Sequence, residues 1–424
     1  METSEQARAP RTATRAQIGS VALGNALEFY DFLIFSIFAV QIGQAFFPAS
    51  DPMNSLLAAL ATFGAGFVTR PLGAWVFGRY ADKRGRRPAM VASFTVLGLS
   101  SLALALIPPY AAIGPAAPAL AIVARLVQGL ALGGEVGPSS AFLAEIAPPE
   151  KRGSYVSLQF ASQNFALLVA GLVGVGLSAV MSETALAVWG WRAALVAGAL
   201  IVPIGLVLRR TLPETLETAA PGTVRAPVPR YRHIAVLALA TIASATVINY
   251  VLTYLSTFAQ AVLAMSPGEA FGAAVAVGVS GTIGAVLSGI LTDRVGRRPV
   301  MLWPMALSVL IVMPIFWLLD AHPLPLLLYL AAFVLRFTTV LAGTAAFIAV
   351  SEAFPTGVRS TALGLTYSLA VSTLGGTTQF VVAWLTKVTG SPLAPAWYMF
   401  AACLVGLAAM VWLRETAPRF TGRA

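Results

Sequence analysis

The sequence predicts an all-α integral membrane protein in which twelve transmembrane helices form two pseudo-symmetric six-helix bundles. Three observations support this fold class. Hydrophobic residues make up 58% of the 424 residues and charged residues only 10%, whereas about a quarter of the residues of a soluble protein are charged. A helix crosses a bilayer with about 20 apolar residues, so this length with short loops holds about twelve spans. One motif also occurs twice, in the two halves of the chain.

The repeated motif lies at 73–88 and returns at 284–299, displaced by 211 residues. Its eight identical positions are Gly73, Ala74, Gly78, Asp82, Gly85, Arg86, Arg87 and Pro88 in the first copy, and Gly284, Ala285, Gly289, Asp293, Gly296, Arg297, Arg298 and Pro299 in the second. Arg125 and Arg336 are separated by the same 211 residues. A weaker echo, Glu145 with Arg152 and Glu352 with Arg359, follows the fourth span of each half. The chain is therefore predicted to be a tandem duplication.

Apolar segments define the predicted spans. They lie at about 18–47, 54–80, 88–107, 115–146, 153–181 and 189–210 in the first half, and at about 233–263, 268–291, 299–319, 324–353, 358–388 and 395–413 in the second. Pro, Thr, Glu and Arg dominate the only long loop, so residues 211–232 are predicted to be a linker. This gives a tail at 1–17, bundles at 18–210 and 233–414, and a second tail at 415–424.

The net charge of +10 reflects membrane topology. Arginines and lysines fall in the tails and in the even-numbered loops, and Lys387 is the one basic residue of the odd-numbered loops. The positive-inside rule places the loops that carry these charges in the cytoplasm. We therefore expect a bacterial inner-membrane protein with both termini cytoplasmic, surrounded by lipid and without a nucleic-acid partner.

Several classes of site are not expected. Cys403 is the only cysteine, and His233 and His322 fall in loops on opposite sides, so no disulfide or metal site is predicted. We find no phosphate-binding loop that ends in Lys-Ser or Lys-Thr, and no combination of nucleophile, base and metal ligand. Residues 1–17 are polar and basic, without the apolar core of a signal peptide. The sequence thus predicts a monomeric protein that is not an enzyme and needs no cofactor.

The repeated motif resembles the signature loop of the major facilitator superfamily. An aspartate at a helix end beside arginines offers charge-assisted bonds that form in one bundle arrangement and break in another. The alternative is that the arginines only fix topology, although this needs no aspartate at a fixed spacing. The gating residues implied by the resemblance are Gly78, Asp82, Gly85, Arg86, Arg87, Gly289, Asp293, Gly296, Arg297 and Arg298.

Within that superfamily, residues 24–32 (GNALEFYDF) resemble the first helix of the metabolite:proton symporters. Residues 46–50, 189–192 and 395–398 are most similar to the citrate and tricarballylate branch. The resemblance implies proton-coupled uptake of a dicarboxylate or tricarboxylate by alternating access, driven by the proton gradient. Other substrates of the family, namely 2-oxoglutarate, shikimate, proline and betaine, remain open.

Buried ionisable residues are candidates for proton coupling because charges are costly in lipid. Glu28 and Asp31 are one helical turn apart and share a face, so their repulsion raises the proton affinity of at least one. The Tyr30 and Asp31 pair with Arg125 resembles the proton-linked arrangement of related sugar porters. We expect Asp31 to take the proton and Arg125 to pair with its ionised form, the alternative being a static ion pair. Glu135, on the polar stripe of the fourth span, is a further coupling candidate.

An anionic substrate needs cationic partners, preferably arginine. Pseudo-symmetry predicts that Arg125 and Arg336 face each other across a central cavity, and Arg70 either joins them or anchors a gate. Neutral candidates, each also consistent with helix packing alone, are Tyr30, Asn25, Gln128, Gln159, Gln163, Asn164, Asn249, Tyr250, Tyr254, Tyr367 and Gln379.

The same residues can be interpreted in three other ways, each of which gives a rival function. A zwitterion symporter would need only one arginine. A drug:proton antiporter should have a glycine–proline pattern in its fifth span, but Ala170, Gly171 and Gly174 have no adjoining proline. A channel or sensor would need neither the duplication nor the buried acid pair.

Overall fold

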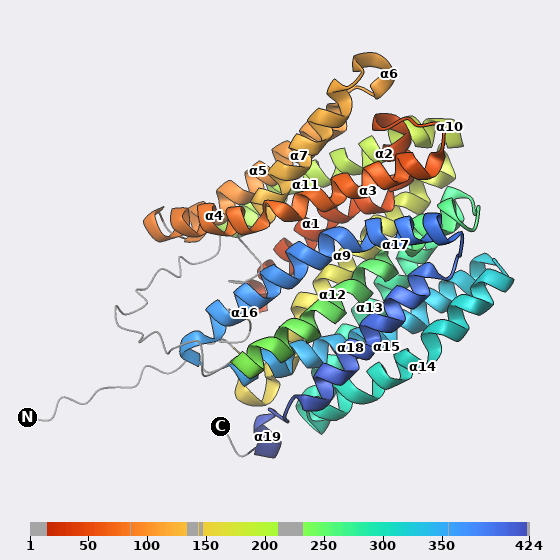
Figure 1. The fold of residues 1–424 in the computed structure, drawn as a ribbon. Helices are drawn as coiled ribbons and strands as arrows, with labels where there is room; N and C mark the ends of the chain where they lie inside the picture. Colours follow the sequence, from red (N-terminus) through yellow and green to blue (C-terminus); the bar gives the residue numbers. More distant parts are fainter. Residues whose placement is uncertain are drawn as a thin grey trace, which may run out of the picture.

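The computed structural model describes residues 15–84, 86–133, 143, 147–210, 232–354 and 356–421. The first half of the chain is built of helices. The helices of this half pack as one bundle (Figure 1). They are α1 (Arg15–Ile37), α2 (Ala39–Phe46), α3 (Pro52–Val68), α4 (Arg70–Arg84), α5 (Arg86–Leu106), α6 (Tyr110–Ile113), α7 (Ala116–Leu132), the 3₁₀ turn η1 (Pro149–Lys151), α9 (Arg152–Val180), α10 (Glu183–Ala185), the π-helical turn η2 (Leu186–Gly190) and α11 (Trp191–Arg210).

The second half forms the other bundle. Its elements are α12 (Arg232–Ala261), α13 (Pro267–Val295), α14 (Arg297–Ala321), α15 (Pro325–Ala353), α16 (Thr356–Ala370), the π-helical turn η4 (Val371–Gly375), α17 (Gly376–Thr389), α18 (Ala394–Trp412) and α19 (Pro418–Thr421). Over the described ranges, nine helices are long and apolar enough to cross a membrane, or ten with the bent pair α1–α2. The shorter helix α7 occupies the fourth predicted span, and α11, which follows the π-helical turn η2, occupies the sixth. The predicted fold class is therefore confirmed.

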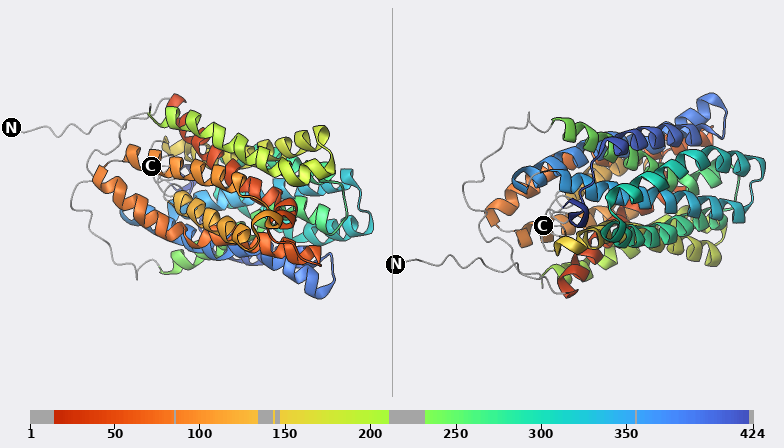
Figure 2. Two further views of the ribbon diagram at one scale, coloured as in Figure 1. Left: turned by 90° about the horizontal axis from the view of Figure 1, so that it is seen from above. Right: turned by 90° about the horizontal axis from the view of Figure 1, so that it is seen from below.

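The two ends of the molecule differ in what they carry. We call the end at which α1 begins and α18 ends the terminal end. The opposite, distal end carries α6 and the turn between α14 and α15 (Figure 2). The linker prediction at 211–232 falls almost wholly outside the described residues, so the domain boundaries remain predictions.

Local breaks interrupt three predicted spans. The span at 18–47 is two helices bent by 63° around Phe38. The span at 54–80 breaks at Thr69, because Pro71 has no N–H to continue the helical ladder; the Thr69 hydroxyl instead donates to the Leu126 carbonyl at 2.7 Å. The span at 358–388 contains the π-helical turn η4.

The bundles are closed against each other at the distal end. A Cβ atom at Gly64 of α3 would overlap the carbonyl of Gly376 in α17, so only glycine permits this backbone approach. Gln41 Nε2 donates to Gln260 Oε1 at 2.7 Å across the same interface. At the terminal end α4 and α16 diverge (Figure 1), whereas α9 and α13 stay packed together.

The first bundle depends on a glycine contact that can be tested. A Cβ at Gly129 of α7 would overlap the carbonyl of Gly66 in α3, so Gly129→Ala should destabilise the protein by about 1–3 kcal/mol through overpacking. The apparent melting temperature of the purified protein in detergent would measure this loss. Gly176→Ala is the matched control, because no atom lies within 4 Å of its added Cβ. Equal melting temperatures for the two variants would contradict the packing argument.

Candidate functional site

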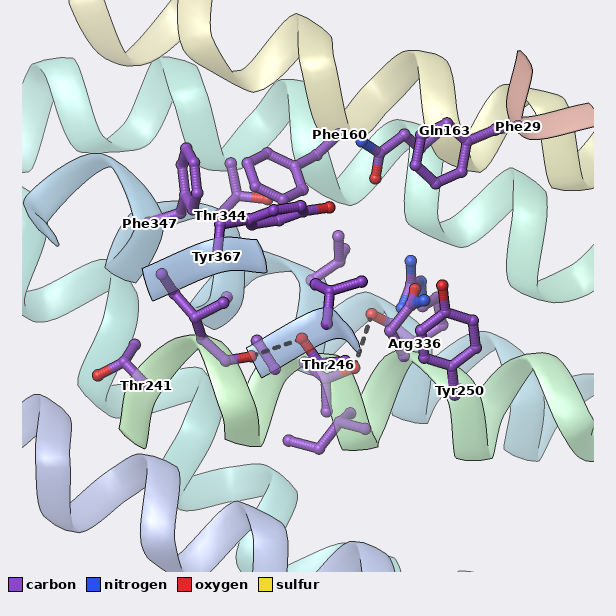
Figure 3. Close-up of a pocket in the computed structure, with 18 residues that line it drawn as sticks. Phe29, Phe160, Gln163, Thr241, Thr246, Tyr250, Arg336, Thr344, Phe347 and Tyr367 are labelled. Carbon is purple, nitrogen blue, oxygen red and sulfur yellow. Dashed lines mark hydrogen bonds between the residues drawn. The ribbon is translucent and has the colours of Figure 1, made fainter. Parts of the chain in front are cut away.

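A pocket of about 800 Å³, part of it open to solvent, lies between the two bundles. Residues of α12, α15 and α16 form most of its wall, and α1 and α9 of the other bundle contribute the rest (Figure 3). Five of the predicted substrate residues line it, namely Gln163, Asn249, Tyr250, Arg336 and Tyr367.

Arg336 supplies the positive charge of this pocket. Its side chain lies on α15 and is 7% exposed. Nε and Nη2 donate to Asn164 Oδ1 of α9 at 2.8 and 2.5 Å, so the bond joins the two bundles. Gly281 of α13 leaves room for this contact, because a Cβ there would overlap the Asn164 side chain. Asn164 therefore reaches the site through Arg336 and is not part of the pocket wall.

The threonines and phenylalanines of the pocket are absent from the predicted site. The Thr241 and Thr344 hydroxyls are buried without a hydrogen-bond partner among the described residues. Thr339 lies one turn from Arg336 on the same helix and donates to the Leu335 carbonyl at 2.6 Å. The missed lining residues of these two kinds are Thr241, Thr246, Thr339, Thr344, Phe29, Phe160 and Phe347. Threonines recurring on α12 and α15 are the only sequence signal that would have indicated them.

A smaller pocket adjoins the first behind Phe29, which lines both. Glu28, Phe32, Arg70 and Leu132 complete it. The Arg70 guanidinium carbon lies 4.7 Å from the Phe32 ring centroid and 4.1 Å from that of Phe67, distances typical of cation–π contacts. Arg70 and Glu28 thus share a side pocket at the edge of the central one.

Arg125 is enclosed in the first bundle. It is fully buried, and its guanidinium carbon lies 4.8, 4.6 and 5.1 Å from the ring centroids of Phe32, Phe35 and Phe63. Nη1 donates to Gln128 Oε1 at 2.7 Å. The structure thus differs from the expectation that Arg125 and Arg336 face each other across one cavity, because three aromatic rings surround Arg125.

Asp31 is also buried, at 3% exposure, and it accepts hydrogen bonds from neutral groups. Ser101 Oγ of α5 donates a short hydrogen bond to Asp31 Oδ2, and Gln128 Nε2 lies 3.5 Å from the same oxygen. The expected direct pairing with Arg125 is replaced by a connection through Gln128. Ser101 was missed because a serine in an apolar helix resembles ordinary packing.

The other predicted polar residues lie outside the pocket, and most of them join helices. Asn25 Nδ2 donates to the Gln159 carbonyl at 3.1 Å, and Gln159 Nε2 donates to Asn25 Oδ1 at 2.9 Å. The Tyr30 hydroxyl donates to the Ala194 carbonyl at 3.2 Å. Gln379 Oε1 accepts from Ser36 Oγ at 2.9 Å across the bundle interface. The Tyr254 hydroxyl is buried without a partner among the described residues.

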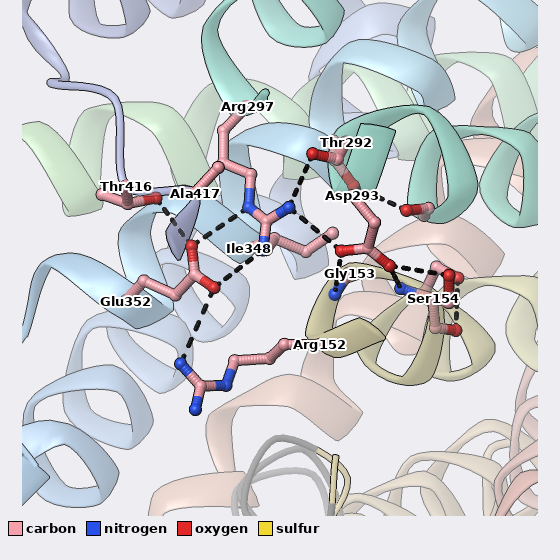
Figure 4. Close-up of polar contacts among 12 residues, drawn as sticks. Arg152, Gly153, Ser154, Thr292, Asp293, Arg297, Ile348, Glu352, Thr416 and Ala417 are labelled. Atoms are coloured by element: carbon pink, nitrogen blue, oxygen red, sulfur yellow. Dashed lines mark hydrogen bonds and ion pairs between the residues drawn. The ribbon is translucent and has the colours of Figure 1, made fainter. Parts of the chain in front are cut away.

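The second copy of the repeated motif forms a charged network at the terminal end (Figure 4). Asp293 accepts from the Gly153 and Ser154 backbone N–H groups at 2.9 and 2.8 Å, at the N-terminus of α9 where a negative charge is favourable. Arg297 lies 3.0 Å from Asp293 and 2.9 Å from Glu352. Arg152 of the first bundle lies 3.9 Å from Glu352, so the network crosses between the bundles.

Two glycines and a glutamate complete this network. A Cβ at Gly289 would overlap the Ser157 hydroxyl, and Gly296 has φ 96°, a conformation that favours glycine. Glu415, which follows α18, accepts from the Arg297 and Arg298 N–H groups, both at 2.9 Å. Partial burial opposes its ionisation, but these and two further backbone donors lower the pKa of Glu415.

The first motif copy falls largely outside the described side chains. Gly85 and Glu135 lie outside the described residues, and the side chains of Asp82, Arg86 and Arg87 are not described. Gly78 lies in α4 with no atom within 4 Å of an added Cβ.

Two helical bundles with a pocket between them, each built on the same repeated pattern, are the architecture of a membrane transporter. The family profile described as Major Facilitator Superfamily matches residues 21–378. The chain belongs to this superfamily, whose members are transporters and not enzymes.

Curated relatives and solved structures agree with this assignment. The citrate-proton symporter of Salmonella typhi is 36% identical over 95% of this chain and 94% of its own length. The alpha-ketoglutarate permease of Escherichia coli K12 is 34% identical, with 91% of each chain covered. The proline/betaine transporter of the same strain is 34% identical over 96% of this chain and 84% of its own. A proton:xylose symporter structure has the same fold, with a TM-score of 0.75 at 18% identity over 95% of this chain and 96% of that one.

An ion pair fastens the distal end. Lys387 Nζ of α17 donates to Asp51 Oδ2 at 2.6 Å and also bonds Asn54, and Asp51 Oδ1 accepts from the Met53 N–H at 2.9 Å. The hydrogen bond from Lys387, followed by that from Met53, lowers the pKa of Asp51 below 3.8. A carboxylate with a depressed pKa stays ionised until the pH falls through the lowered value, so this contact persists throughout the neutral and mildly acidic range.

Lys387→Ala should therefore loosen the distal end, and to the same extent at pH 5 and pH 8. Spin labels on cysteines that replace the exposed Tyr110 and His322, in a background where the buried Cys403 is alanine, report the separation of the two bundles. We expect a larger population of long distances in Lys387→Ala, modest because exposed ion pairs are weak. Lys387→Arg keeps the charge and serves as control. Unchanged distances in Lys387→Ala would show that the ion pair does not hold the bundles together.

Proposed function

We propose that this transporter imports a small organic acid with two or three carboxylates, such as citrate, together with protons. The observation that carries the proposal is the separation of two buried sites: the pocket around Arg336, and the cluster around Asp31 in the first bundle. One site suits an anion and the other suits a proton. The likeness to a citrate-proton symporter over nearly the whole chain supports the same function.

The pocket chemistry favours a carboxylate. A guanidinium offers parallel donors that match a carboxylate, and it stays charged at any physiological pH. The unpaired hydroxyls of Thr241 and Thr344 offer donors for further oxygens of the substrate. Arg70, in the side pocket behind Phe29, is a candidate partner for a second carboxylate.

Proton coupling is assigned to the acidic residues of α1. Asp31 and Glu28 are both less than 5% exposed, and an ionised carboxylate in a membrane bundle is costly unless it is paired. Asp31 is the proposed proton carrier, with Arg125 acting through Gln128. Glu28 and Glu135 are retained as further coupling candidates.

Alternating access follows from the two ends of the molecule. The bundles are closed at the distal end, while α4 and α16 diverge at the terminal end. We assign the terminal end to the cytoplasm of a bacterial inner membrane, as the positive-inside rule favours. The Asp293 network then serves as a cytoplasmic gate that breaks and re-forms in each cycle, and the chain works as a monomer.

A zwitterion is the second candidate substrate. Phe29, Phe160, Phe347 and Tyr367 line the pocket together with one arginine, and aromatic faces attract quaternary ammonium groups. A relative is named as a proline/betaine transporter. The aromatic lining therefore suits betaine, with Arg336 on its single carboxylate.

Uptake into proteoliposomes separates these candidates. Purified protein is reconstituted, an inward proton gradient is imposed, and uptake of citrate, tricarballylate, 2-oxoglutarate, shikimate, proline and betaine is measured. We expect acid-driven accumulation of citrate or a related polycarboxylate, abolished by a protonophore. Ligand-induced melting shifts at two pH values identify binding without transport. Accumulation of betaine alone would overturn the carboxylate assignment. Uptake that does not depend on the imposed proton gradient would overturn proton coupling.

Arg336→Ala should weaken carboxylate binding by roughly 10- to 100-fold, because a hydrogen-bonded charge is lost. Arg336→Lys should recover only part of the affinity, since lysine lacks the planar fork. The dissociation constant from melting shifts and the KM for uptake provide the measurements. Arg294→Ala is the matched control, because Arg294 is exposed and distant in sequence from the pocket. Wild-type affinity in Arg336→Ala would remove Arg336 from the substrate site.

A further inference from the structure

Ser101 lies where three helices of the first bundle meet. It belongs to α5, is fully buried, and contacts the acid of α1 and an amide of α7. Gln128 Nε2 donates to Ser101 Oγ at 2.6 Å, and Ser101 Oγ donates to Asp31 Oδ2. The neighbouring Ser100 differs, because its hydroxyl donates to the Leu97 carbonyl of its own helix at 2.8 Å.

The direction of every bond in this cluster is fixed by chemistry. Arginine can only donate, so the Gln128 atom that faces Arg125 must be the amide oxygen, 2.7 Å from Nη1. The amide nitrogen of Gln128 then points to Ser101 and donates to it. The Ser101 hydroxyl accepts from Gln128 with one of its lone pairs and donates its proton to the ionised Asp31, which can only accept. Arg125, Gln128, Ser101 and Asp31 thus form a chain in which each member donates to the next.

The chain is complete only when Asp31 Oδ2 accepts. This favours the ionised carboxylate, because a donor bonded to the charged form stabilises that form. The other oxygen, Oδ1, is buried with no hydrogen-bond partner in the described part of the protein. It lies against α11, where a Cβ at Gly198 would be 3.1 Å away. A proton can therefore reside on Oδ1 while Oδ2 stays held.

We propose that Ser101 and Gln128 are positioning residues for the proton-carrying carboxylate, connecting it to the charge of Arg125 without direct contact. This proposal rests on the proposed proton coupling. Ser101 holds Asp31 in one orientation and sets the pH at which it exchanges a proton. The Gln128 amide connects Arg125 to Ser101, because its oxygen accepts from Arg125 and its nitrogen donates to Ser101. A merely structural role would require only that the buried hydroxyl be satisfied, as that of Ser100 is.

Other charged or titratable groups lie near Asp31 or near its partner Arg125. Tyr30 of α1 and Arg125 of α7 interact with Asp31, and Arg70 of α4 and Tyr250 of α12 interact with Arg125. Glu28 lies one helical turn from Asp31 on α1 and shares the side pocket with Arg70. The tests below leave all of them intact, so any change is assigned to the serine or the amide.

Infrared spectroscopy on the purified full-length protein measures the proton exchange directly. The protonated-carboxyl band that disappears in Asp31→Asn is followed as the pH is varied. Ser101→Ala removes a donor to the ionised form, so the midpoint should move to higher pH by about one unit, equivalent to a tenfold change in proton affinity. Ser101→Thr keeps a hydroxyl and should restore the midpoint. Gln128→Leu should also raise it, because both ends of the amide are lost.

Ser100→Ala is the matched control and should leave the midpoint unchanged. The pH at which proteoliposome uptake is half-maximal should move with the infrared midpoint, and Ser101→Ala should have no further effect in the Asp31→Asn background, measured by substrate exchange. An unmoved midpoint in folded Ser101→Ala, or an equal change in Ser100→Ala, overturns the positioning role. A different result separates the two proposals. If the midpoint moves in Ser101→Ala but uptake by the wild-type protein does not depend on pH, proton coupling is overturned and the hydrogen-bond chain stands.

Discussion

The cost of holding ionised side chains inside a membrane bundle is the constraint on which the rest of this structure depends. A buried charge without partners is strongly unfavourable, and this protein meets the cost in several ways. Aromatic rings and one amide surround Arg125. Arg336 is held by a single amide oxygen beside an open pocket. Arg297, at the terminal end, pairs with two carboxylates. Of these three arginines, Arg336 has the fewest partners, and it lies at the proposed substrate site.

Equivalent residues of the two halves have the same position in the fold but different surroundings. Arg125 and Arg336 occupy equivalent helices, yet one is sealed in the first bundle and the other faces the pocket. Because each bundle folds around its own side chains, a repeated backbone can support two different chemical tasks. Coupling between a proton and a cargo requires such a difference, since two identical sites would bind the same ligand.

Much of the fold could be predicted from the sequence, because apolar length and the motif repeat determine where helices begin and end. The bend at Phe38 could not, because no proline or glycine lies beside it. The π-helical turn at Val371–Gly375 ends at a glycine pair, but two glycines do not specify a π-helical turn. Helical periodicity places Gln128 and Asn25 on polar faces, but it does not reveal which helix lies opposite. Only the fold shows that Gln128 meets Ser101, whereas Asn25 meets Gln159. Serine and threonine partners were missed for the same reason.

The bond between Arg336 and Asn164 joins the two bundles beside the proposed substrate pocket. Asn164 belongs to the first bundle and Arg336 to the second, and the two donors of Arg336 converge on one oxygen at 2.8 and 2.5 Å. A carboxylate that takes these same donors must displace Asn164, because a guanidinium edge cannot serve both. If the cargo binds Arg336 as proposed, binding exchanges a contact between bundles for a contact with cargo. The difference in binding free energy between Asn164 and the carboxylate then shifts the equilibrium between the bundle arrangements. A ligand shifts a conformational equilibrium only through its different affinities for the two states.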